Sequence, residues 1–204
     1  MTATLALAPM SGTEVILIRH GESVWNAERR WQGQADPPLS ERGRAQAHDA
    51  AAAIAALRPQ VLYASDLVRA FETATILGRE LGLEPNAEPR LREFHVGEWS
   101  GLTVAEIDAR WPGEYARFRS REPDLRPGGG ESPRELMGRI LAALGDIAAR
   151  HPGERVAAVS HGGVARSLTS ASLDNLGFVR LRHAGDRAWH PLDEASGGGP
   201  FFDL

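Results

Sequence analysis

The chain has 204 residues, of which 42% are hydrophobic and 25% charged, a composition that suits one globular domain with its own hydrophobic core. Its net charge of -4 argues against nucleic-acid binding and against an anionic membrane partner, so any phosphate site must be a local basic pocket. The absence of Cys excludes disulfides, thiolate nucleophiles and cysteine metal sites.

The two ends of the chain look different from its middle. Residues 1–13 are expected to form a frayed leader: they contain Pro9 and no basic stretch, which argues against a signal peptide. No apolar run approaches the roughly 20 residues of a membrane span. The cytoplasm is therefore the expected location. A single domain is expected over residues 14–193, and the Gly-rich residues 194–204 are expected to form a mobile tail.

The first half of the domain predicts two strands that alternate with two helices. Residues 14–19 and 61–64 are short apolar runs, typical of strands buried on both faces. Ser40 is a suitable N-cap for the Ala-rich helix that follows it. A second helix is expected over residues 66–81, closed by Gly82 at its C-terminal end.

The second half predicts further helices and strands. Capping boxes that begin at Thr103 and Ser132 mark two helix starts, and the second helix is expected to reach about Arg150. The Pro- and Gly-rich residues 122–131 between them resemble a surface loop or lid. The later elements are a strand over residues 155–160, a helix from Gly163, and two weaker strands around Phe178 and Trp189 joined by a hairpin turn at Gly185-Asp186.

Strands that alternate with helices predict an α/β fold, a three-layer α/β/α sandwich with a mostly parallel central sheet. Ligands of such sheets bind beyond the carboxyl ends of the strands. Three predicted strands end in reactive side chains. Arg19 and His20 follow the first strand, Arg69 lies about one helical turn beyond the second, and His161 follows the strand over residues 155–160. We expect these side chains to meet at one rim.

Two arginines and two histidines at one rim indicate phosphoryl chemistry. Arg offers paired donors that match phosphate oxygens, and a neutral imidazole offers a lone pair for attack. Nearby guanidinium groups favour that neutral form because they repel a second positive charge. Gly21 and Gly162, which lack a Cβ, are expected to let the backbone approach a bound phosphate closely.

Five sequence blocks in the same order resemble the histidine phosphatase superfamily, also called the phosphoglycerate mutase-like family, and its compact phosphatase branch in particular. The resemblance covers residues 14–166. The first block is Arg19-His20-Gly21-Glu22 to Asn26, continued by Gln32-Gly33 and Asp36-Pro37-Pro38-Leu39. The others are Ser65-Asp66 with Arg69, Leu91-Arg92-Glu93 to Gly101, Gly129-Gly130-Glu131-Ser132, and Ser160-His161-Gly162-Gly163.

The resemblance implies a role for each matched residue. His20 would become phosphorylated, while Arg19, Arg69 and His161 would hold the phosphoryl oxygens. Glu93 would act as general acid and then as general base. Further phosphate or substrate contacts are expected from Gly21, Asn26, Gln32, Gly33 and Gly162. The family needs no cofactor, and the sequence shows no metal-ligand spacing.

Several alternatives stay open at the level of sequence. Glu98 and Glu131 compete with Glu93 for the acid role, and His95 is either structural or substrate-facing. His20 could be a structural buried histidine, and the chain could be a regulatory binding module that has lost turnover. The presence of both histidines and their basic partners favours an enzyme.

Within the family, hydrolysis is favoured over phosphoglycerate mutase activity because residues 101–132 are short and do not resemble the longer cover of a mutase. The expected substrate is a small phosphorylated metabolite. Residues 167–175 are also shorter than expected for the family. This deletion would open one wall of the pocket or expose a surface for self-association, which leaves open a homodimer.

Overall fold

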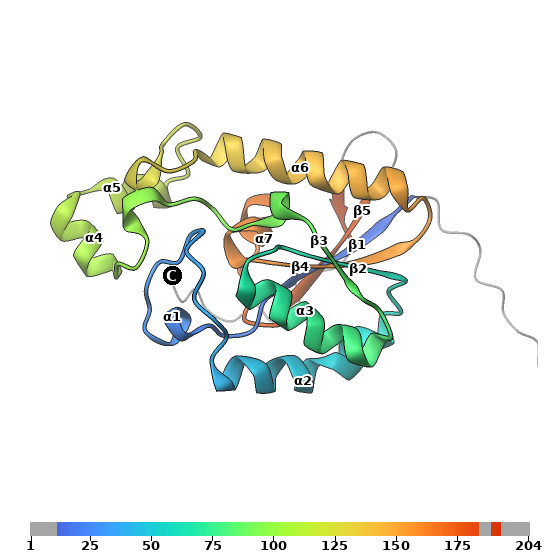
Figure 1. Cartoon of the computed structure of the whole chain (residues 1–204). Coiled ribbons are helices and arrows are strands. Elements are labelled where there is room, and N and C mark those ends of the chain that lie inside the picture. Colours follow the sequence, from blue (N-terminus) through green and yellow to red (C-terminus); the bar gives the residue numbers. More distant parts are fainter. Residues whose placement is uncertain (1–11, 184–188, 193–204) are drawn as a thin grey trace, which may run out of the picture.

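A computed structural model describes residues 12–183 and 189–192 (Figure 1). Within these ranges the chain forms a six-stranded sheet in the order β3-β2-β4-β1-β5-β6. The strands are β1 (Glu14–Arg19), β2 (Val61–Ala64), β3 (Pro85–Ala87), β4 (Arg155–Ser160), β5 (Phe178–His183) and β6 (Trp189–Pro191). β1 to β4 pair in parallel, whereas β5 pairs antiparallel with both β1 and β6, so β5 alone among these strands runs in the opposite direction; this confirms a mostly parallel sheet.

The capping residues correctly predicted the starts of α2, α4 and α6 and the end of α3. The helices are α1 (Val24–Ala27), α2 (Glu41–Ala56), α3 (Val68–Leu81), α4 (Val104–Arg110), α5 (Glu114–Arg119), α6 (Pro133–Arg150) and α7 (Gly162–Thr169), with the 3-10 helices η1 (Pro89–Leu91), η2 (Gly97–Trp99) and η3 (Pro127–Gly129). The Ser40 side chain caps α2, and Ser132 forms a reciprocal capping box with Glu135 at α6. Gly82 ends α3 with a φ of 65°.

Both faces of the sheet are covered by helices. Along β1, Val15 and Leu17 face one hydrophobic core, whereas Ile16 and Ile18 face the other, because side chains alternate along a strand. The first core contains residues of α6 and α7, and the second contains residues of α2 and α3. Figure 1 shows α6 on one side of the sheet and α2 and α3 on the other. The three-layer α/β/α sandwich is therefore confirmed.

The structure differs from the expected elements at several points. α3 begins at Val68 rather than Asp66, because the Asp66 carboxylate accepts two hydrogen bonds from Arg92 (2.7 and 2.6 Å) instead of capping the helix. The short elements α1, β3 and α5 were not expected. The predicted turn at residues 185–186, the leader up to residue 11 and the tail over residues 194–204 lie outside the described ranges. Thr13 has a buried side chain whose hydroxyl donates to the Ala148 and His151 carbonyls.

Residues 92–131 form a long connection between the sheet and α6, and this connection places α4 and α5 beyond one end of α6 (Figure 1). Aromatic side chains hold it together: Trp31, Trp99 and Phe118 pack edge to face, with ring centroids 5.4 to 5.6 Å apart. The Gly-rich stretch before α6 is pinned closely against the chain before η2: a Cβ on Gly128 would lie 2.5 Å from the Val96 carbonyl oxygen, and the Gly128 N–H donates to Glu114 at 2.8 Å. Among the helices in the described ranges, none is long and apolar enough to cross a bilayer.

Candidate active site

The pairing of β1 with β4 places the two predicted histidines side by side. Arg19 lies opposite Ser160 in this parallel register, so His20 and His161 both follow directly after the last paired residues. Their ring centroids are 5.1 Å apart at an interplanar angle of 66°. His20 is 3% exposed and His161 is fully buried. The convergence expected from the strand ends is therefore present.

The His20 ring is oriented by its own backbone neighbourhood. Its Nδ1 lies 2.6 Å from the Gly21 carbonyl oxygen. Because a carbonyl oxygen accepts and never donates, Nδ1 carries the proton and Nε2 keeps the lone pair. Arg69 Nε donates to this Nε2 atom at 3.3 Å. The nitrogen available for attack on phosphorus is therefore Nε2.

Both histidines are held in the neutral form. Burial lowers the pKa of His20 well below its usual value, and the charges of Arg69 and Arg19 lower it further. Burial likewise lowers the pKa of His161, again with Arg69 adding to the effect. At neutral pH each ring is therefore an imidazole, and His20 has the lone pair that a nucleophile requires.

His161 lies behind His20 and offers one unused nitrogen. Ser65 Oγ lies 2.9 Å from its Nε2 and itself accepts a hydrogen bond from the Leu67 backbone N–H. The Ser65 hydroxyl can donate its proton to Nε2, and in that tautomer Nδ1 carries the ring proton. His161 Nδ1 is buried and has no hydrogen-bond partner among the described residues. Such an atom is an expected donor to a ligand oxygen.

Two arginines stand beside the histidines. Arg69 is fully buried and donates to the carbonyls of Gly33 and Ala35 at 2.8 Å each. Burial lowers the pKa of Arg69 to about 10, so the side chain remains charged at neutral pH. Arg19 Nη1 donates to the Leu173 carbonyl at 2.7 Å, while Arg19 Nε is buried without a described partner. Both guanidinium groups are held rigidly by backbone oxygens, as anion binding requires.

Glu93 is fixed by two backbone amides. Its Oε1 accepts from the Phe94 N–H at 2.7 Å, and its Oε2 accepts from the Gly163 N–H at 2.9 Å. Among the described residues that line the cavity, Glu93 is the one acid. Glu98 is exposed, and Glu131 forms an ion pair with Arg139. Of the three carboxylates left open by the sequence, Glu93 is thus the one that faces the site.

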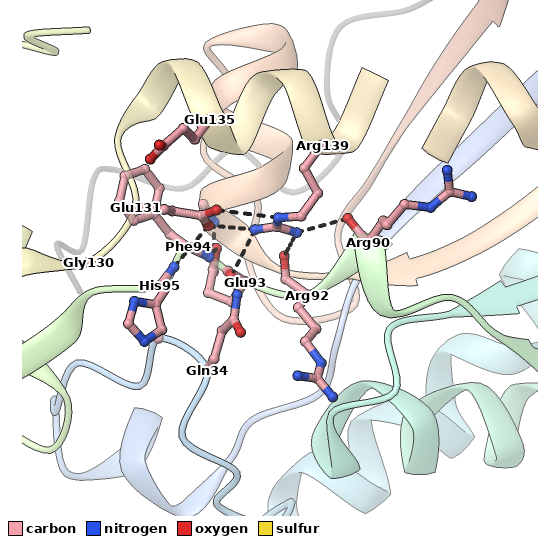
Figure 2. A network of polar contacts seen from close by, with 12 residues as sticks. Gln34, Arg90, Arg92, Glu93, Phe94, His95, Gly130, Glu131, Glu135 and Arg139 are labelled. Carbon is pink, nitrogen blue, oxygen red and sulfur yellow. Dashed lines mark hydrogen bonds and ion pairs between the residues drawn. The ribbon is translucent and has the colours of Figure 1, made fainter. Parts of the chain in front are cut away.

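Arg139 of α6 holds the segment that carries Glu93, as Figure 2 shows. Its guanidinium donates to the carbonyls of Arg90 and Arg92 at 2.8 Å each and to the Glu93 carbonyl at 3.2 Å. It also donates to Glu131 at 2.5 Å, and Glu131 accepts from the backbone N–H of His95. The His95 side chain is exposed. The Glu93 backbone is therefore clamped on the side opposite its carboxylate.

The predicted substrate-binding residues separate into two groups. Asn26, Gln32, Gly33 and Gly162 line the cavity together with Arg19, His20, Arg69 and Glu93, whereas His161 is not among the lining residues. Gly21 is placed differently from expectation: its N–H donates to Thr73 Oγ1, and a Cβ on it would lie 2.5 Å from the Gly43 carbonyl oxygen. A side chain at Gly21 is excluded by the close approach of α2, and the residue is not among those that line the cavity.

Comparison with known proteins agrees with this geometry. The family model described as histidine phosphatase superfamily (branch 1) matches residues 15–189. The chain belongs to the histidine phosphatase superfamily. It is 44% identical to phosphoglycerate mutase-like protein 4 of Arabidopsis thaliana over 76% of this chain and 69% of the relative. It is 40% identical to the metal-independent phosphoserine phosphatase of the same plant over 87% and 79% of the two chains.

A solved structure of mycobacterial glucosyl-3-phosphoglycerate phosphatase is similar to this histidine phosphatase along nearly its whole length. The TM-score is 0.83 and the sequence identity is 31%, over 91% of this chain and 99% of the other. The fold expected from the sequence and the membership of the family are thus confirmed independently of each other.

Some residues of this histidine phosphatase site were not predicted from the sequence. Arg30, Gly163 and Arg166 line the cavity, and Arg139 acts from behind Glu93. Arg139 and Arg166 lie on helices, where arginines are commonly surface residues, and Arg30 lies in the loop after α1, so no local signal distinguished these arginines. With Arg19 and Arg69, four guanidinium groups face one carboxylate in the cavity. This is the local basic pocket that a chain of net charge -4 requires for a phosphate ligand.

Proposed function

We propose that this histidine phosphatase hydrolyses phosphate monoesters of small metabolites through a phosphohistidine at His20. The observation that carries the proposal is the orientation of His20: Nδ1 is fixed on the Gly21 carbonyl, so Nε2 carries the lone pair, and attack on phosphorus would replace the 3.3 Å hydrogen bond that Nε2 accepts from Arg69 Nε. Arg19, Arg69 and His161 Nδ1 would bind the phosphoryl oxygens and stabilise the charge that develops on them.

The reaction has two steps. In the first, His20 Nε2 forms a bond to phosphorus while the bond to the ester oxygen breaks, and the protonated Glu93 carboxyl transfers its proton to that oxygen. In the second, the Glu93 carboxylate takes a proton from water, the water oxygen bonds to phosphorus, and the phosphorus–nitrogen bond breaks. Inorganic phosphate leaves and the enzyme returns to its starting state.

Water is favoured as the acceptor over a second hydroxyl of the substrate. Relatives bear both phosphatase and mutase names, so family membership alone does not decide between them. The short connection over residues 101–132 supports hydrolysis, because α4, α5 and the pinned loop before α6 occupy this stretch as a compact lobe. The cytoplasmic location, the homodimer and the domain limits 14–193 remain predictions from the sequence.

The decisive experiment is phosphoenzyme trapping with His20→Ala. The wild-type protein should hydrolyse 4-nitrophenyl phosphate equally well with and without a chelator and give an acid-labile phosphoenzyme after rapid quenching. His20→Ala should lose both signals. His48→Ala, on the exposed face of α2, is the matched control and should keep them. A phosphoenzyme formed by His20→Ala would exclude His20 as the nucleophile.

A second measurement separates phosphatase from mutase. 3-Phosphoglycerate supplied with 2,3-bisphosphoglycerate should yield mainly inorganic phosphate. Rapid formation of 2-phosphoglycerate would instead show that a hydroxyl group, and not water, accepts the phosphoryl group.

A further inference from the structure

A second cavity adjoins the phosphate pocket. Phe94 and Arg166 belong to both, so the two cavities share a wall beside Glu93. The second cavity lies where the end of α5, the first turns of α6 and the middle of α7 come together. Its lining residues are Phe94, Phe118, Arg119, Arg121, Pro133, Met137, Arg166 and Ser167. We call it the leaving-group groove, because a phosphate ester held by His20 would extend its alcohol past Glu93.

One wall of the groove is apolar. Phe94 and Phe118 pack edge to face with ring centroids 5.6 Å apart, which fixes both rings. Pro133 and Met137 continue this surface from α6, and Met adapts its shape to an apolar partner. Contact with such a wall is favourable for carbon-rich groups, whereas a small polar alcohol would leave it unfilled.

The other wall is cationic. Arg119, Arg121 and Arg166 line it, and none of the lining residues is acidic. Arg121 Nη1 donates to Ser170 Oγ at 3.1 Å, which ties the end of α5 to the end of α7 and orients this guanidinium. Burial lowers the pKa of Arg166, Glu93 raises it, and Arg119 and Arg121 lower it. Guanidinium groups donate paired hydrogen bonds to carboxylate and phosphonate oxygens, so this wall suits an anionic group.

We propose that the leaving-group groove binds the alcohol part of the substrate, and that the enzyme prefers phosphate monoesters whose alcohol has an apolar body ending in an anionic group. The proposal rests on the phosphatase function proposed above. The position of the groove beside the phosphate pocket indicates where the alcohol lies, the aromatic wall indicates an apolar body, and the three arginines indicate its charge. Arg binds carboxylate and phosphonate groups alike, so the structure indicates a negatively charged end on the alcohol without distinguishing a carboxylate from a phosphonate.

The first test uses the wild-type enzyme and three aryl phosphates that differ at one end. Phosphate esters of 4-hydroxyphenylpropionic acid, of its amide and of the matching phosphonic acid share the same ring and the same leaving oxygen. The two anionic esters should exceed the amide in kcat/KM by about 10-fold, the ratio expected for one good charge-assisted contact. O-Phosphoserine, which has a charge but no apolar body, should react more slowly than either anionic ester.

The second test removes the charge from the groove. The double variant Arg119→Gln/Arg121→Gln should reduce the ratio of kcat/KM for the anionic ester to that for the amide towards 1. Arg110→Gln removes an exposed arginine of α4 that does not line the groove and should leave this ratio unchanged. Circular dichroism checks that each variant is folded, and the ratio is independent of the fraction of active enzyme.

The outcomes separate this proposal from the one on which it rests. If the wild-type enzyme hydrolyses 4-nitrophenyl phosphate but treats the amide and both anionic esters alike, the groove does not bind the charged end. If O-phosphoserine is the fastest substrate, the apolar wall does not select the body. Absence of turnover with 4-nitrophenyl phosphate would instead overturn the phosphatase function itself.

Discussion

Gly163→Ala is a direct test of how Glu93 is placed. A Cβ on Gly163 would lie 2.3 Å from Glu93 Oε1 and 3.0 Å from its Cδ. An ordinary contact needs roughly 3.4 Å, so the carboxylate must retreat by about 1 Å. The backbone of Gly163 is already helical, so Ala adds no strain of its own there. A displacement of this size at a reacting group costs about 100-fold in rate, or about 2.7 kcal/mol of transition-state stabilisation.

The assay compares two leaving groups in the Gly163→Ala variant. Phenyl phosphate has a poor leaving group that needs a proton from Glu93, whereas 4-nitrophenyl phosphate has a good one that needs little help. We expect kcat to fall by about 100-fold for phenyl phosphate and much less for 4-nitrophenyl phosphate. The thermal midpoint should change little, because the atom that must move is the end of a flexible side chain.

Gly138→Ala on α6 is the matched control. A Cβ there meets nothing within 4 Å, so this variant should gain about 0.5–1 kcal/mol of stability and keep its activity. A folded Gly163→Ala enzyme that hydrolyses phenyl phosphate at the wild-type rate would refute the idea that the amide-held position of Glu93 matters for catalysis.

Three further predictions concern neighbouring groups. Glu93→Gln should lower kcat for phenyl phosphate at least about 100-fold and Glu98→Gln hardly at all, measured by steady-state kinetics; the opposite order would move the acid role to Glu98. Arg139→Gln should lower kcat by about 10-fold and should also lower the thermal midpoint, because the Glu93 backbone loses the hydrogen bonds that hold it. Arg139→Lys should be intermediate in both measurements. A variant with lowered stability but full kcat would restrict Arg139 to a structural role. Stability should fall as the pH drops below about 6.5, since His20 and His161 have lowered pKa values in the folded protein and the unfolded chain takes up protons first. His161→Gln should weaken this pH dependence in thermal melts, and an unchanged pH dependence would contradict the buried neutral state.

The part of the fold that was predictable from the sequence is the part with strong local signals. The β-branched run of β1 and the caps at Ser40 and Ser132 each specify an element by themselves. β3 was missed because Pro85, Asn86 and Ala87 carry no strand signal, and its pairing with β2 depends on the tertiary structure. The start of α3 was misplaced for a similar reason, since Asp66 pairs with the distant Arg92 and the first helical N–H, that of Val68, donates to the distant Asp36.

The site was predictable as far as its residues follow strand ends or belong to recognisable blocks. His20 and His161 follow paired strands, so knowledge of the parallel sheet was sufficient to bring them together. Arg139 and Arg166 lie on helices where arginines are usually solvated, and their roles depend on contacts with residues tens of positions away. Gly21 was assigned a phosphate contact because a missing Cβ permits a close approach to the backbone. The sequence does not say which neighbour makes that approach, and in the structure it is Gly43 of α2.

The contact between Gly21 and Gly43 has a consequence for engineering. A Cβ on Gly43 would lie 2.0 Å from the Glu22 carbonyl oxygen, just as one on Gly21 would strike Gly43. Substitutions at Gly21 or Gly43 would therefore disrupt the packing of α2 against the loop after β1. Arg121 and Met137, in contrast, line the leaving-group groove and lie outside the phosphate pocket. Directed evolution confined to these two positions would therefore diversify the alcohol accepted while the phosphate-binding residues stay unchanged.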